Sequence, residues 1–138
     1  MLRNVLALVG GVVICGVVIT LVQMLSHWMY PFPAGMDPSD PKAIEAMLPH
    51  LPLGALLMVE LSYLLGSGCG GWVVGRFARS RQDWLAVGLG AVFTLANVAN
   101  LVQIPHPLWL AVLTTVTFIP VALLASRLAR RGAPAPAT

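Results

Sequence analysis

The stretch LPLGALLMVELSYLLGSGCGGWVVG (51–75) decides the fold, because it is apolar throughout except for one charged side chain, Glu60. A helix rises about 1.5 Å per residue, so about 20 apolar residues cross the roughly 30 Å of hydrocarbon in a bilayer. The stretch therefore predicts a transmembrane helix with Glu60 about 14 Å below its outer end. A charge at that depth is costly and usually has a structural or functional partner.

Composition extends this prediction to the whole chain. Of 138 residues, 58% are hydrophobic and 9% are charged, whereas about a quarter of the residues in a soluble domain are charged. The apolar residues gather in four stretches, at about 4–27, 51–75, 84–104 and 107–127. Long uninterrupted runs are typical of helices, because membrane strands alternate over about ten residues. The sequence predicts an all-α, four-helix transmembrane bundle.

The basic residues predict the orientation of these spans. Only Lys42 lies in the loop after the first span, and the other basic residues lie on the opposite side of the predicted membrane: Arg3, Arg76, Arg79, Arg81, Arg127, Arg130 and Arg131. Cytoplasmic loops are enriched in Lys and Arg, so we expect both termini in the cytoplasm of a bacterial cell, with the protein in its cytoplasmic membrane. Anionic lipid headgroups explain the net charge of +3 better than nucleic acid does.

The chain is expected to form one membrane domain over 1–131, followed by a disordered cytoplasmic tail over 132–138. The first span is expected to stay attached as an anchor, because its apolar core is longer than that of a signal peptide and no small-residue cleavage site follows it.

The loop between the first two spans contains a helix start signal. Asp40 followed by Pro41 is a favourable N-cap and first-turn pair, which predicts a short helix over about 41–48. Its apolar stripe favours an amphipathic helix that lies on the outer membrane surface or caps the bundle. Asp37 and Asp40 alone do not make a calcium site, because the rest of a ligand loop is missing.

Glycines in the second span predict close helix packing. Gly66 and Gly70 are four residues apart, as are Gly71 and Gly75, and this spacing lets another helix backbone approach. The expected partner glycines lie in the first and third spans: Gly10, Gly11, Gly16, Gly88 and Gly90. We favour packing within one molecule over homodimerisation.

Polar side chains from all four spans fall in the outer half of the predicted membrane. The set comprises Glu60, Asn97, Asn100, Thr20, Gln23, Thr114 and Thr117. In one interpretation they fasten helices together, with Glu60 protonated and hydrogen-bonded to Asn97 or a threonine. In the other they line a wet pocket open to the outside, with Glu60 as a proton carrier or cation ligand. Both interpretations stay open on the sequence alone.

Metal and thiol chemistry have little support. The three histidines are expected at the outer boundary, without H-x3-H or HExxH spacing, so we expect no metal site and no cofactor. Cys15 and Cys69 are predicted to differ in depth by about 10 Å, which is too far for the separation that a disulfide requires. This argues against a thiol redox protein.

Four segments resemble parts of small four-span bacterial membrane proteins with no established activity: MYPFPAGMDPSD (29–40), LPLGALL (51–57), GGWVVGR (70–76) and IPHPLW (104–109). The resemblance implies the four-span topology and no mechanism. The leading hypothesis is a non-enzymatic accessory or scaffolding subunit that packs in the bilayer against other membrane proteins or against itself. The alternative is a small oligomeric transporter or channel with an outward-facing polar pocket around Glu60. An intramembrane enzyme is the least favoured hypothesis.

Overall fold

The computed structural model describes residues 1–37, 39–104 and 106–131, so the tail over 132–138 lies outside the described residues. Four long helices account for most of this part of the chain: α1 (Leu2–Met29), α3 (Leu53–Phe77), α4 (Gln82–Gln103) and α5 (Leu108–Arg131). Each is long and apolar enough to cross a membrane. The structure therefore confirms the prediction of an all-helical chain with four such helices.

A short helix lies in the loop between α1 and α3. It is α2 (Pro41–Met47), and a 3-10 turn, η1 (Leu48–His50), continues it. The side chain of Asp40 accepts a hydrogen bond of 3.0 Å from the backbone N–H of Lys42, at the N-cap position. Leu48 is buried in a cluster with Leu56 of α3 and Leu110 of α5. The α2–η1 segment is therefore anchored to the long helices through Leu48.

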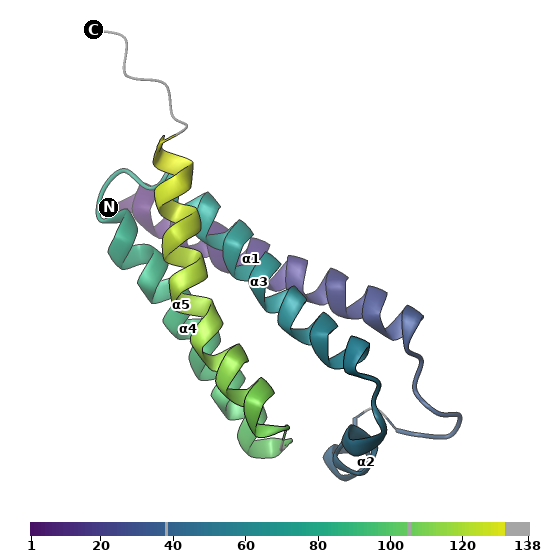
Figure 1. The fold of residues 1–138 in the computed structure, drawn as a ribbon. Helices are drawn as coiled ribbons and strands as arrows, with labels where there is room; N and C mark the ends of the chain where they lie inside the picture. The colour runs from purple at the N-terminus through teal and green to yellow at the C-terminus, as the bar shows by residue number, and fades with distance from the viewer. Residues whose placement is uncertain (38, 105, 132–138) are drawn as a thin grey trace, which may run out of the picture.

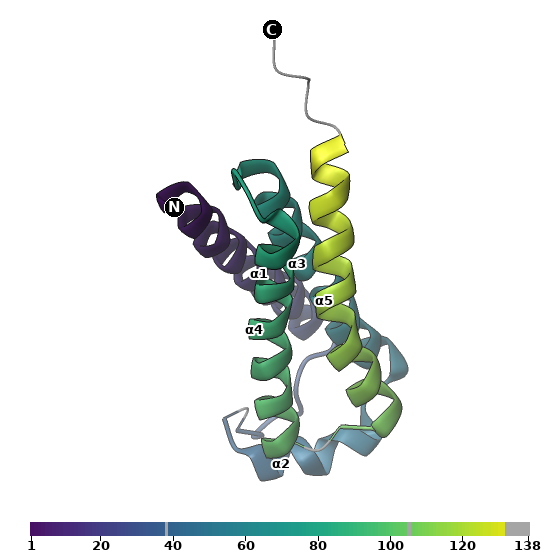
Figure 2. The same ribbon diagram turned by 90° about the vertical axis from the view of Figure 1, so that its left-hand side faces the viewer.

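The four long helices form two pairs, α1 with α3 and α4 with α5. α3 packs against the three other long helices, and α4 packs along α5. α1 runs beside α3, and these two pairs cross near the termini and diverge toward α2 (Figure 1). Figure 2 shows α2 and its flanking loops at the end opposite to the termini. We call these the α2 end and the basic end, the latter for its arginines.

Backbone contacts hold the basic half of the bundle together. A Cβ added at Gly71 or Gly75 of α3 would overlap the backbone of Ala122 or Ser126 in α5. On another face of α3, a Cβ at Gly70 would lie 2.6 Å from the carbonyl oxygen of Gly11 in α1. Only glycine permits such approach without moving a helix. The α3 glycines therefore allow close backbone contact with both α1 and α5.

The partners of these glycines differ in part from the expected ones. Gly90 of α4 packs on Ile119 of α5 rather than on α3, and a Cβ at Gly16 or Gly88 would meet nothing within 4 Å. The α5 partners are Ala122 and Ser126, which lie four residues apart. Alanine and serine are also small enough to allow close helix contact.

The two cysteines lie at similar depth, so the predicted difference of about 10 Å is wrong. Cys15 is fully buried against Gly66 and Gly70, which lie on either side of Cys69 in the chain. The prediction failed because α1 extends to Met29 and α3 begins at Leu53. These bounds increase the depth of Cys15 below the outer end of its helix and decrease the depth of Cys69. Both cysteines are free, and Cys69 is exposed while Cys15 is not.

Side chains at the basic end tie its turns together. Asn4 accepts hydrogen bonds from the backbone N–H groups of Arg79 and Ser80, at 2.9 and 3.3 Å. Asp83, at the start of α4, forms ion pairs with Arg127 and Arg130 of α5. The N-terminus, the turn after α3 and the last turns of α5 are thus fixed to one another.

Candidate functional site

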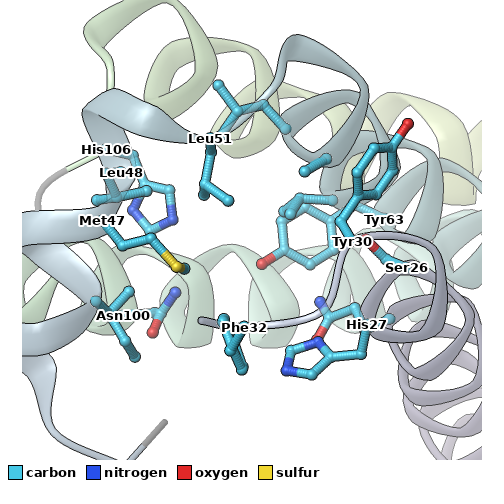
Figure 3. Close-up of a pocket in the computed structure, with 15 residues that line it drawn as sticks. Ser26, His27, Tyr30, Phe32, Met47, Leu48, Leu51, Tyr63, Asn100 and His106 are labelled. Carbon is cyan, nitrogen blue, oxygen red and sulfur yellow. The ribbon is translucent and has the colours of Figure 1, made fainter. Parts of the chain in front are cut away.

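A cavity of about 200 Å³ lies at the α2 end, where the two helix pairs diverge. Figure 3 shows Ser26, His27, Tyr30 and Tyr63 on one side of it, and Met47, Leu48, Asn100 and His106 on the other. The first group comes from α1, the residue after it, and α3. The second comes from α2, η1, α4 and the turn before α5. The cavity therefore lies between segments that are distant in sequence.

A second cavity of about 260 Å³ adjoins the first. Both are lined by Gln23, Tyr63 and Asn100. The other residues that line the second cavity come from α1, α4 and α5: Ile19, Phe93, Ala96, Asn97 and Phe118. Phe118 packs against Tyr63 and Phe93, with ring centroids 4.8 and 5.8 Å apart. The two cavities therefore meet at three polar side chains and border an aromatic cluster.

Glu60 is buried against α5, away from both cavities. It is 6% exposed, and its Oε1 lies 2.5 Å from the hydroxyl oxygen of Thr117. It also borders a shallow groove along α3, with Tyr30 and Leu57 among the other lining residues. The pocket that the sequence suggested around Glu60 is therefore a different feature from the cavities at the α2 end.

The contacts of Thr117 bear on the charge of Glu60. The Thr117 hydroxyl lies 2.5 Å from Glu60 Oε1 and 2.8 Å from the carbonyl oxygen of Leu113. A hydroxyl carries one proton and a carbonyl oxygen only accepts. Two full hydrogen bonds form at once if Thr117 donates to Leu113 and a protonated Glu60 donates to Thr117. The geometry fits a neutral carboxylic acid, whose Oε2 is buried without a partner among the described residues.

The other predicted polar residues form separate pairs between helices. Asn97 of α4 donates to the hydroxyls of Thr114 and Thr115 in α5, at 3.1 and 3.3 Å. Gln23 of α1 donates from Nε2 to the hydroxyl of Ser62 in α3, at 3.5 Å. The predicted band of polar residues is thus divided among the α3–α5, α4–α5 and α1–α3 interfaces.

Thr20 and Asn100 form no side-chain hydrogen bond to another helix among the described residues. Thr20 is exposed, and its hydroxyl donates to the carbonyl oxygen of Gly16 in its own helix, at 2.9 Å. Asn100 lines both cavities, and its side chain has no hydrogen-bond partner within the part of the chain that the structure describes. Of the predicted set, Asn100 and Gln23 line both cavities, and Asn97 lines the second.

Several cavity residues were missed by reasoning from sequence. Tyr63 has the only aromatic hydroxyl in the stretch 51–75, and that chemistry was the available signal. His106, which was expected only to lie at the outer boundary, lines the first cavity. Its Nδ1 lies 2.7 Å from the carbonyl oxygen of Ile104, so Nδ1–H donates there. In the neutral ring, Nε2 remains as an acceptor.

The acidic residues of the loop serve local turns. The hydroxyl and the backbone N–H of Ser39 both donate to Asp37 Oδ1, at 2.6 and 2.8 Å. These two hydrogen bonds lower the pKa of the Asp37 carboxyl below its usual value. Asp40 caps α2. Turn formation therefore accounts for both carboxylates.

Comparisons with protein-family models, with curated proteins and with solved structures found no match to this chain. Where the two cavities meet, uncharged hydrogen-bonding side chains lie next to apolar walls. Such a site can bind the polar group of a molecule through neutral donors and acceptors.

Proposed function

We propose that the protein is a non-enzymatic accessory or scaffolding subunit in the cytoplasmic membrane of a bacterium. The observation that supports this most is the outward face of α1. α1 has 28 residues, of which Ala7, Gly11 and Cys15 are buried. Most of its surface is therefore available to lipid or to a helix of another protein.

The outward face of α1 has the pattern of a helix contact. Gly16 and Thr20 are four residues apart, and a Cβ at Gly16 would meet nothing within 4 Å. Thr20 is exposed, as are Val13 and Val17 on the same helix face. Small residues at this spacing let a second helix approach closely. The partner expected here is a transmembrane helix of another subunit or of a second copy.

The use of the intramembrane polar groups also fits a structural role. Glu60, Asn97 and Gln23 each bond to a side chain of a neighbouring helix. Such bonds fasten transmembrane helices. Backbone contacts at Gly71 and Gly75 bring α3 and α5 together in the basic half, which leaves little space there for a path through one molecule.

In-cell photo-crosslinking tests this proposal. A photoreactive residue replaces Val13 or Val17 on α1, and matched controls replace Val112 or Val116, which are exposed on α5. We expect both α1 positions to give the same protein adduct, which Gly16→Leu removes and Gly88→Leu does not. Adducts with lipid alone at all four positions would overturn the proposal. Glu60→Gln should leave the adduct intact.

A small oligomeric transporter or channel is the second candidate, favoured by the groove along α3 that Glu60 borders. Because Glu60 would be the proton carrier in that case, proteoliposomes should take up protons, and Glu60→Gln should abolish the uptake. An accessory subunit gives no proton uptake in either form. A pH-sensitive dye trapped in the vesicles measures the difference.

A further inference from the structure

Three polar side chains with spare hydrogen-bonding capacity meet at the junction of the two cavities. Tyr63 and Asn100 have no side-chain partner among the described residues, and Gln23 uses only Nε2, toward Ser62. All three line both cavities. All three are half-buried, so water or a bound molecule can complete their hydrogen bonds. The junction therefore offers a hydroxyl, an amide and an amide oxygen to a bound molecule.

The residues at the junction of the cavities do not favour a charged ligand. In the part of the chain that the structure describes, neither cavity is lined by Asp, Glu, Lys or Arg. A phosphate, carboxylate or ammonium group at the junction would lose its hydration without gaining a counter-charge, which is strongly unfavourable. The head of a fitting ligand is therefore uncharged and carries hydroxyl or carbonyl oxygens.

The remaining walls fit an apolar body. Met47, Leu48 and Leu51 line the first cavity, and Phe93 and Phe118 line the second. The second cavity also borders Ala96, which is exposed on α4, at a depth where a membrane helix contacts hydrocarbon. An apolar tail that leaves the second cavity beside Ala96 would therefore enter hydrocarbon.

We propose that the joined cavities bind one uncharged amphiphile. Its oxygen-bearing head is held by Tyr63, Asn100 and Gln23, and its tail leaves the protein beside Ala96. Cavities of about 200 and about 260 Å³ together fall in the size range of about 300–1,000 Å³ that is usual for small-ligand sites. Diglycerides and isoprenoid quinones share this chemistry. This site is independent of the α1 face on which the scaffolding proposal rests.

Calorimetric titration of the full chain in nanodiscs tests the proposal. The probes are 1,2-dioctanoylglycerol, a decyl-substituted benzoquinone, and dodecyl phosphate as the anionic comparison. We expect saturable binding, one molecule per chain, of at least one neutral probe and no saturable binding of the phosphate. The probe that binds more tightly identifies the source of the ligand as glyceride or quinone.

Variants locate the binding. Loss of one hydrogen bond should raise Kd by about three- to tenfold, so we expect this for Asn100→Leu and for Tyr63→Phe. Ala96→Phe should block the exit and abolish saturable binding. The control Thr20→Val removes an exposed hydroxyl that bonds only within α1 and should leave Kd unchanged. Because Asn100 has no partner to lose, Asn100→Leu should keep the unfolding temperature of the unliganded protein.

Three results would overturn the proposal. They are absence of saturable binding for both neutral probes, equal binding of dodecyl phosphate, and an unchanged Kd in folded Asn100→Leu and Ala96→Phe proteins.

Discussion

The basic half and the α2 half of this helix bundle are held together by different interactions. In the basic half, α3 meets α5 at Gly71 and Gly75 and meets α1 at Gly70, backbone against backbone. In the α2 half the helix pairs diverge (Figure 1), and they are joined by a side-chain bond between Glu60 of α3 and Thr117 of α5. Close packing leaves no room for ligands, whereas divergence does. The comparison indicates that close backbone contacts stabilise the basic half, whereas the α2 half contains the cavities.

The largest effect is expected where a substitution breaks the backbone contacts of the basic half. Gly71→Ala places a methyl group against the backbone of Ala122, so α3 and α5 must separate. We expect the free energy of unfolding to fall by about 3 kcal/mol, near the upper range for overpacking. Gly16→Ala is the matched control, because its Cβ meets nothing within 4 Å. Equal unfolding curves in mixed micelles for the two variants would contradict this.

The next effect tests the buried pair between α3 and α5. Thr117→Val keeps the shape of the side chain and removes the partner of Glu60. Leaving a buried polar group unsatisfied costs about 1–3 kcal/mol, so we expect a loss of about 2 kcal/mol. Glu60→Gln retains a donor toward Thr117 and should cost less than about 0.5 kcal/mol if the native group is a neutral acid. A larger loss for Glu60→Gln than for Thr117→Val would argue for an ionised carboxylate.

A smaller difference is expected between the two asparagines of α4. Asn97 bonds to Thr114 and Thr115 of α5, and interhelical hydrogen bonds in membranes contribute about 0.6–1.7 kcal/mol. Asn97→Leu should therefore lower the free energy of unfolding by about 1 kcal/mol. Asn100→Leu should leave it unchanged. Chemical unfolding of the two variants side by side decides whether only Asn97 fastens helices.

The smallest effect is expected at the surface of the basic end. Asp83→Asn removes the ion pairs with Arg127 and Arg130. The Asp83 side chain is 41% exposed, and exposed ion pairs contribute little to stability. We expect a small loss of stability at low salt that shrinks at 1 M salt, because salt screens exposed charges. A loss that is unchanged by salt would contradict an electrostatic origin.

Sequence reasoning succeeded for properties that lie along one helix. Runs of apolar residues were sufficient to predict four long helices, because length and hydropathy need no knowledge of neighbours. The same is true of Asp40, whose capping role depends on adjacent residues.

Sequence reasoning did not determine which neighbour each helix face meets. Glu60 and Tyr63 are three residues apart, yet Glu60 bonds to α5 and Tyr63 lines the cavities. A sequence gives the depth of a residue, but the rotation of a helix about its axis depends on all its partners. Depth itself was wrong for the cysteines, because the count began from approximate helix ends. The contacts at Ala122 and Ser126 were missed because only glycines were considered.

Cysteine labelling tests the central comparison most directly. In a Cys69→Ala background, the buried Cys15 serves as an internal reference. Asn100→Cys places a thiol at the junction of the cavities, and Ser126→Cys places one in the closed basic half, where Ser126 is fully buried. A small polar methanethiosulfonate reagent added at the α2 side should modify Asn100→Cys rapidly and leave Ser126→Cys as unreactive as Cys15. Equal rates at the two positions would contradict an open α2 half above a closed basic half.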